Sequence, residues 1–201
     1  MRLIEIYAKL KSLGLNYFYT HDVAAYLDIN IGHASKYLQR LAKTNHIIHV
    51  ARGKWVFPDT DRLALPSILT APFPTYISLQ SALYYHGMIS QIPDTLYAVS
   101  LARTHFFKTQ LGNISIHHIQ PDFFFGFEET NDSLVRIATP EKALIDLFYL
   151  GDVKTKLFSA LPEVEFPDSF SVKKAQEIIK KIPSERKKNL VTTRFKLLHQ
   201  Q

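Results

Sequence analysis

The first 58 residues contain three short helical patterns followed by two strand patterns around a glycine, and few folds fit that order. Apolar side chains recur at three- and four-residue steps in the first and third patterns, as in amphipathic helices. Gly14 ends the first, Thr20 can cap the second, and turn-prone residues 28–32 separate the second from the third. The predicted elements are helices over 2–13, about 21–27 and about 32–44, an extended piece at 17–19, and strands over 47–50 and 55–57.

The third predicted helix has one apolar and one basic side. At 3.6 residues per turn, Ala34, Leu38 and Leu41 fall on the same side, and basic residues cluster on another. Three helices, a tight turn and a closing hairpin match the winged helix-turn-helix, whose third helix enters the major groove of double-stranded DNA. The candidate DNA-binding residues on this helix are Gly32, His33, Ser35, Lys36, Gln39, Arg40 and Lys43.

Side-chain chemistry assigns possible roles within that set. Arg40 or Lys36 can contact guanine, and Gln39 can pair with adenine. Arg52 and Lys54 flank the glycine at the predicted hairpin tip, where they are placed to reach phosphate or a minor groove. The alternative is a small helical unit whose basic face binds another protein, but a basic hairpin tip favours DNA.

The net charge of +6 is distributed unevenly along the chain. Residues 1–58 hold eight basic residues and three acids, residues 59–172 hold seven and thirteen, and residues 173–201 hold nine and two. A basic start, an acidic middle and a basic tail suggest two surfaces that suit phosphate and one that does not. The acidic middle also leaves open a protein-interaction module that holds a basic partner.

Prolines at positions 66, 72 and 74 follow the hairpin and indicate a connection between two units. We therefore expect a winged helix-turn-helix domain over residues 1–60 and a second domain over 61–201. Mixed patterns make the second domain α+β, so the fold class of the whole chain is α+β. Its predicted elements are a helix over 78–86, strands near 96–101, 114–117, 123–127 and 134–137, and a helix from Thr139 to Leu150.

Two segments of the second domain carry a resemblance to a known family. They are Tyr76 to Gly87, with Ile92-Pro93 following, and Ala138 to Leu147, which contains Thr139-Pro140-Glu141-Lys142. Together with the first domain they resemble the AbiEi family of antitoxins from type IV toxin-antitoxin systems, over roughly residues 1–150.

This resemblance implies a cytoplasmic transcriptional autorepressor that binds repeats in its own promoter. It also implies a nucleotidyltransferase toxin as functional partner, opposed without a stable complex, and a C-terminal part that is needed for antitoxicity. The family supplies no catalytic residue. The absence of cysteine fits a reducing cytoplasm, and no apolar run near 18 residues or signal-peptide pattern predicts a membrane segment.

Enzymatic functions find little support in the sequence, which predicts no catalytic residue, no metal site and no cofactor. His86, His105, His117 and His118 lack a metal-ligand spacing, and adjacent His117 and His118 should point to opposite faces of a strand. The remaining enzymatic alternative is a DNA-targeted, metal-dependent nuclease that uses Asp152 or Asp122. Phe123, Phe124, Phe125 and Phe127 are expected in a core or interface.

Beyond residue 172 the sequence predicts an amphipathic basic helix. Val172, Ala175, Ile178, Ile179 and Ile182 form its apolar side, and lysines occupy the other. The pattern does not predict ordered structure after Ile182. The basic side could be solvated, extend a DNA footprint onto the backbone, or contact an acidic partner.

Overall fold

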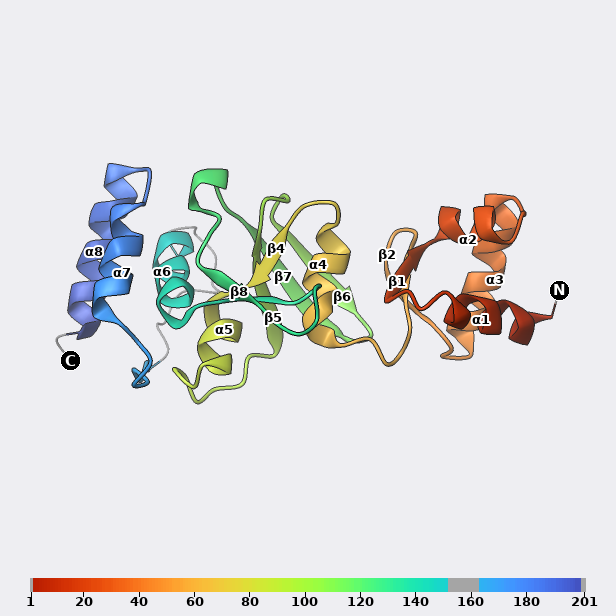
Figure 1. Ribbon diagram of the computed structural model, residues 1–201, viewed down its shortest axis with the longest axis horizontal. Coiled ribbons are helices and arrows are strands. Elements are labelled where there is room, and N and C mark those ends of the chain that lie inside the picture. Colours follow the sequence, from red (N-terminus) through yellow and green to blue (C-terminus); the bar gives the residue numbers. More distant parts are fainter. Residues whose placement is uncertain (1, 152–162, 200–201) are drawn as a thin grey trace.

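The structure is a computed structural model that describes residues 2–151 and 163–199. It is an α+β molecule, as predicted, with two sheets and helices on the outside of both. Residues 2–58, here called the head, lie at one end, residues 59–151, the body, lie in the middle, and the C-terminal helices lie at the other end (Figure 1). Within the described residues, none of the helices combines the length and the apolar character that crossing a membrane requires.

The head contains the helices and strands that the sequence predicts, with boundaries shifted by one or two residues. Its three-stranded antiparallel sheet has the order β1-β3-β2, in which Phe18 lies opposite Trp55. The helices enclose a core that includes Ile6, Leu38 and Leu41. The elements are α1 (Leu3–Ser12), β1 (Tyr17–Tyr19), α2 (Thr20–Tyr26), α3 (Ile31–Lys43), β2 (Ile48–Ala51) and β3 (Lys54–Val56).

The start of α2 differs from the prediction that Thr20 caps it. Tyr19 occupies the cap position, and its backbone N–H donates to the carboxylate of Asp22 at 3.1 Å. The Thr20 hydroxyl instead accepts a hydrogen bond from Trp55 Nε1 at 2.9 Å. Thr20 therefore ties α2 to the buried tryptophan of β3, where its hydroxyl satisfies the indole N–H.

The body is built on a six-stranded sheet of order β6-β7-β5-β4-β9-β8. β5 and β7 run parallel, as do β4 and β9, and the remaining neighbours are antiparallel. The strands are β4 (Thr75–Ile77), β5 (Thr95–Ser100), β6 (His105–Thr109), β7 (Gly112–His118), β8 (Phe127–Glu129) and β9 (Arg136–Ala138). The helical elements are η1 (Arg62–Ala64), α4 (Leu65–Thr70), α5 (Leu79–Tyr85), η2 (Pro121–Phe123) and α6 (Pro140–Leu150).

α6 confirms the predicted cap, first-turn proline and helix end. Its Thr139 side chain accepts from the backbone N–H of Lys142, and Gly151 follows its last residue. In contrast, the predicted strand over 123–127 is wrong. The phenylalanines begin in η2 and pass through an irregular stretch, and only Phe127 enters a strand. Phe123 is buried and the other three rings pack partly buried against the same core, so the rings do not alternate across a pleat.

Two helices, α7 (Val172–Lys180) and α8 (Glu185–His199), pack against α6. The predicted amphipathic helix is confirmed by α7, which buries Ala175, Ile178 and Ile179. Ordered structure does continue past Ile182, since α8 inserts Val191 and Phe195 into the core of the body.

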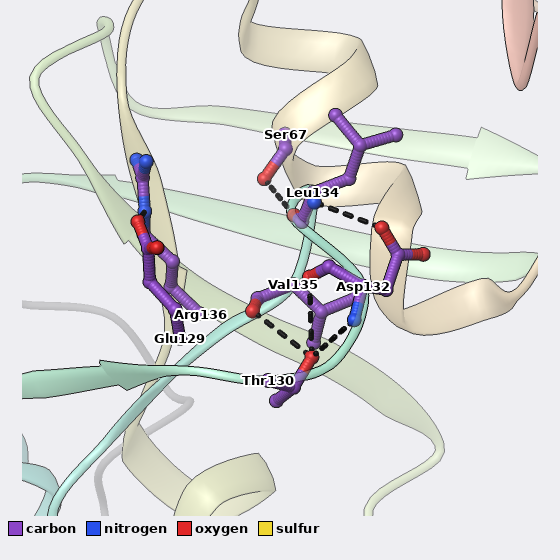
Figure 2. A network of polar contacts seen from close by, with 7 residues as sticks. All are labelled: Ser67, Glu129, Thr130, Asp132, Leu134, Val135 and Arg136. Carbon is purple, nitrogen blue, oxygen red and sulfur yellow. Dashed lines mark hydrogen bonds and ion pairs between the residues drawn. The ribbon is translucent and has the colours of Figure 1, made fainter.

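Head and body are joined by shared contacts as well as by the chain. Ile48, Val50 and Val56 of the β2–β3 hairpin belong to the same apolar cluster as Leu65 and Ile68 of α4. Figure 2 shows that α4 is also fixed on the body side, where Ser67 Oγ donates to the carbonyl of Leu134 at 2.6 Å.

Leu134 is held in turn by the β8–β9 connection. Its N–H donates to Asp132 at 2.9 Å, and the hydroxyl of Thr130 bonds to the backbone on both sides of the turn. α4 is therefore one of the elements through which the hairpin of the head meets the body (Figures 1 and 2), and β2 also contacts β6 of the body sheet directly.

Candidate nucleic-acid interface

The predicted DNA-binding residues of α3 lie together on the side of the helix that faces away from the head core. Ala34, Leu38 and Leu41 are at most 1% exposed. Ser35 is half-buried and accepts from Gln39 Nε2 at 3.3 Å, which positions the Gln39 amide along the helix. The exposed members are Gly32, His33, Lys36, Gln39, Arg40 and Lys43.

The first turn of α3 is fixed by Asn30. Its side-chain oxygen accepts the backbone N–H of His33 at 2.9 Å, and its amide nitrogen lies 3.4 Å from the His33 ring. Because a side-chain cap is worth about 1 kcal/mol, Asn30 determines where α3 starts and so which residues form its exposed first turn.

The cations of this face have no carboxylate partner among the described residues. Lys36, Arg40 and Lys43 form no ion pair there. Two of the three acids of the head, Glu5 and Asp22, accept backbone N–H groups at the starts of α1 and α2. An exposed cationic strip without local counterions suits a ligand that brings its own negative charge.

The two basic residues at the hairpin tip are placed differently from each other. Arg52 is exposed and unpaired within the described part of the chain. Lys54 points into the molecule, where its Nζ donates to the carbonyls of Ile68 and Leu69, both at 2.9 Å, and of Ala71 at 3.3 Å.

Lys54 thus departs from the expectation that it reaches phosphate. Its ammonium satisfies carbonyls at the C-terminal end of α4 that have no partner within that helix. Burial lowers the pKa of Lys54. The contact depends on α4, a six-residue helix of the body. The sequence pattern around residue 65 does not predict this helix, so the contact could not be predicted either.

The histidines of the body are dispersed. His117 is buried and His118 exposed, which confirms their opposite orientation in the strand. His86 Nε2 donates to the carbonyl of Ala138 at 2.7 Å. Over residues 2–151 and 163–199, no group of three or more His, Asp or Glu side chains is arranged to hold a metal ion. Asp122 lies in η2, and Asp152 is outside the described residues.

A buried polar cluster in the body was not anticipated from the sequence. Lys142 and Asp146 of α6 form an ion pair with no exposed surface. Asp146 also accepts from the hydroxyls of Tyr76 at 2.9 Å and Ser78 at 2.8 Å. Burial lowers the pKa of Lys142 and raises that of Tyr76.

Phenylalanine rings complete this cluster. Lys142 Nζ lies 3.9 Å from the ring centroid of Phe123 and 5.2 Å from that of Phe125. The available signal was the i,i+4 spacing of Lys142 and Asp146 on a helix that is otherwise apolar after Glu141 in its first turn. Completely enclosed, the cluster supports the fold and offers no access to a substrate.

Part of the basic charge of the C-terminal helices is engaged within the protein. Arg194 donates to the carbonyl of Phe148, Lys188 pairs with Glu185, and Lys187 and Lys181 lie over aromatic rings. α7 and α8 lie at the end of the molecule opposite α3 (Figure 1). The C-terminal helices therefore do not extend the basic face of α3.

No protein-family model matches the sequence, and no curated protein matches it.

Proposed function

We propose that the head is a winged helix-turn-helix and that the protein binds double-stranded DNA through α3. The observation that carries the proposal is the exposed, uncompensated basic face of α3, opposite a fully buried apolar side. A helix that packs on α2 by one side and presents Lys36, Gln39 and Arg40 on the other has the residue types that recognise base edges and phosphates.

In this proposal Arg40, Lys36 and Gln39 contact bases, and Lys43 contacts the backbone. Of the hairpin residues, Arg52 is available for phosphate, whereas Lys54 fastens the hairpin to α4. The resemblance to AbiEi antitoxins extends the proposal to a cytoplasmic autorepressor, acting on repeats in its own promoter and opposing a nucleotidyltransferase toxin. The similarity of the segments 76–87 and 138–147 supports that extension.

The test is a salt-titrated gel shift on the DNA upstream of the gene, with a scrambled duplex as competitor. We expect specific retention with a steep salt dependence, because each phosphate contact releases a counterion. Arg40→Ala and Lys36→Ala should each weaken specific binding by about 1–3 kcal/mol. Lys180→Ala is the matched control, since this exposed lysine of α7 lies at the opposite end of the molecule and should leave binding unchanged.

Unchanged operator binding by Arg40→Ala would show that α3 does not face the DNA. Equal, weak binding to both duplexes would reduce the basic face to nonspecific charge. The antitoxin extension has its own test, which is coexpression with the product of the adjacent gene. We expect rescue of growth, and two separate peaks in size-exclusion chromatography.

A further inference from the structure

A cleft of about 640 Å³ opens in the body between α5 and the strands β4, β5 and β9. Its size is within the range of small-molecule sites, about 300–1,000 Å³. Most of its walls are apolar, and its mouth exposes apolar side chains, with Ile92 69% and Tyr85 58% exposed. The apolar lining residues are Leu63, Ile77, Ile89, Ile92, Pro93, Leu96 and Ile137.

One cation stands in this apolar lining. Arg62 of η1 donates from Nη2 to the carbonyls of Asp94 at 3.0 Å and Asn113 at 3.5 Å. Gly112 permits this position, because a Cβ there would lie 3.0 Å from Nε and 3.1 Å from Cζ of Arg62. The guanidinium of this exposed residue is therefore held by one backbone carbonyl just before β5 and by another at the start of β7.

Arg62 forms no ion pair within the described residues. Both hydrogen bonds of the Arg62 side chain come from Nη2. A guanidinium has five N–H donors, so those at Nε and Nη1 have no protein acceptor in the described part of the chain. A fixed cation with free donors, beside an apolar wall, complements an anion attached to an apolar group.

We propose that this cleft binds a small organic anion with an apolar body, an aromatic or branched-chain carboxylate, and that Arg62 anchors the carboxylate. Tyr84 and Tyr85 of α5 supply aromatic surface at the mouth, and Ile137 of β9 contributes to the apolar wall. The inference uses no residue of the proposed DNA-binding face, so either proposal can fail without the other.

The test compares carboxylates with their neutral amides on the full chain by calorimetry. The probes are phenylacetate, 3-phenylpropanoate and 4-methylpentanoate, each with the corresponding amide. We expect at least one carboxylate to bind about tenfold or more tightly than its amide, the margin expected for a hydrogen bond to a charged group. Absence of binding by all three acids, or equal affinity of acids and amides, would overturn the proposal.

Arg62→Gln should lower the affinity for the carboxylate to that of the amide, while Arg103→Gln should change neither. Arg103 is an exposed arginine outside the cleft, so equal weakening by both variants would mean nonspecific charge attraction and refute the anchor. Because Arg62 bonds to the backbone and its replacement can disturb folding, Ile92→Glu provides a second variant at an exposed position. Its negative charge at the mouth should weaken binding of the acid severalfold relative to Ile92→Gln, with binding of the amide unchanged.

Discussion

Asp146 joins three segments of the body through a single carboxylate. It accepts from Lys142 one turn earlier in α6, from Tyr76 in β4, and from Ser78 just before α5. None of the four side chains is more than 1% exposed. In such surroundings a charge without its partner is costly, whereas a complete pair is close to neutral compared with apolar side chains.

Asp146→Asn should therefore destabilise the protein by about 3–5 kcal/mol, because it leaves the Lys142 ammonium buried without a counter-charge. Adding Lys142→Met should restore more than half of that loss, since the double variant buries no charge. The amide oxygen introduced by Asp146→Asn can still accept from the hydroxyls of Tyr76 and Ser78. Urea unfolding of the two variants measures the difference. Equal stability of the single and double variants would show that the ion pair itself is unimportant.

His117 makes stability depend on pH. Burial lowers its pKa from 6.5 to about 4, so the folded protein holds a neutral ring where the unfolded chain holds a charged one. The unfolded state thus binds more protons between pH 6.5 and 4, and stability falls as the pH falls through that window, by up to about 3 kcal/mol in total. His117→Gln should flatten the pH profile of unfolding, and His118→Gln, at the exposed neighbour, should leave it unchanged. Parallel profiles for wild type and His117→Gln would contradict the assignment.

At the scale of elements, sequence patterns predicted the helices that carry their own signals. α3 has strict apolar spacing, and α6 has a threonine cap, a first-turn proline and a closing glycine. These signals act within a few residues, and the structure confirms both helices. The face of α3 proposed to bind DNA could be assigned in the same way. Once Ala34 and Leu38 are buried, the opposite side of the helix has to be the exposed one.

Elements that depend on distant partners could not be predicted. β4 and β6 are placed by pairing with β5 and β7, and α4 by packing against the head hairpin, so their own residues carry little signal. α8 begins with the charged residues 185–188 and packs on the body by inserting Val191 and Phe195 into its core. The direction of Lys54 belongs to this class as well, since only the packed position of α4 supplies carbonyls for it.

Replacing the two basic residues of the hairpin should have different effects on DNA binding and on stability. Arg52→Ala should reduce the slope of DNA affinity against salt by about one phosphate contact without changing stability. Lys54→Ala should lower the thermal stability, because it leaves three carbonyls of α4 and its end without their donor, and should leave the salt slope unchanged. A lower salt slope for Lys54→Ala at unchanged stability would mean that Lys54 leaves α4 to contact DNA.

On the scale of the whole molecule, apolar contacts continue from the head hairpin through the body to the C-terminal helices. Ile48 and Val56 of the hairpin, Ile68 of α4, and Phe195 of α8 all belong to one cluster. Polar contacts reinforce the junction, with Lys11 paired to Asp59 at 2.7 Å across the surface. The orientation of α3 relative to the body is therefore set by packing as well as by the connecting chain.

Such continuity predicts that head and body unfold together. Trp55 is the single tryptophan and is buried in the head, so its fluorescence reports on the head alone, whereas far-ultraviolet circular dichroism reports on all helices. In urea we expect both signals to change at the same midpoint, as in a two-state transition. Lys54→Ala should shift the fluorescence midpoint to lower urea than the dichroism midpoint, because it weakens the junction from the hairpin side while the body keeps its own core. Two separate transitions in the wild type would show that the junction contributes too little to couple the two parts, and α3 would then be free to reorient on its connection to the body.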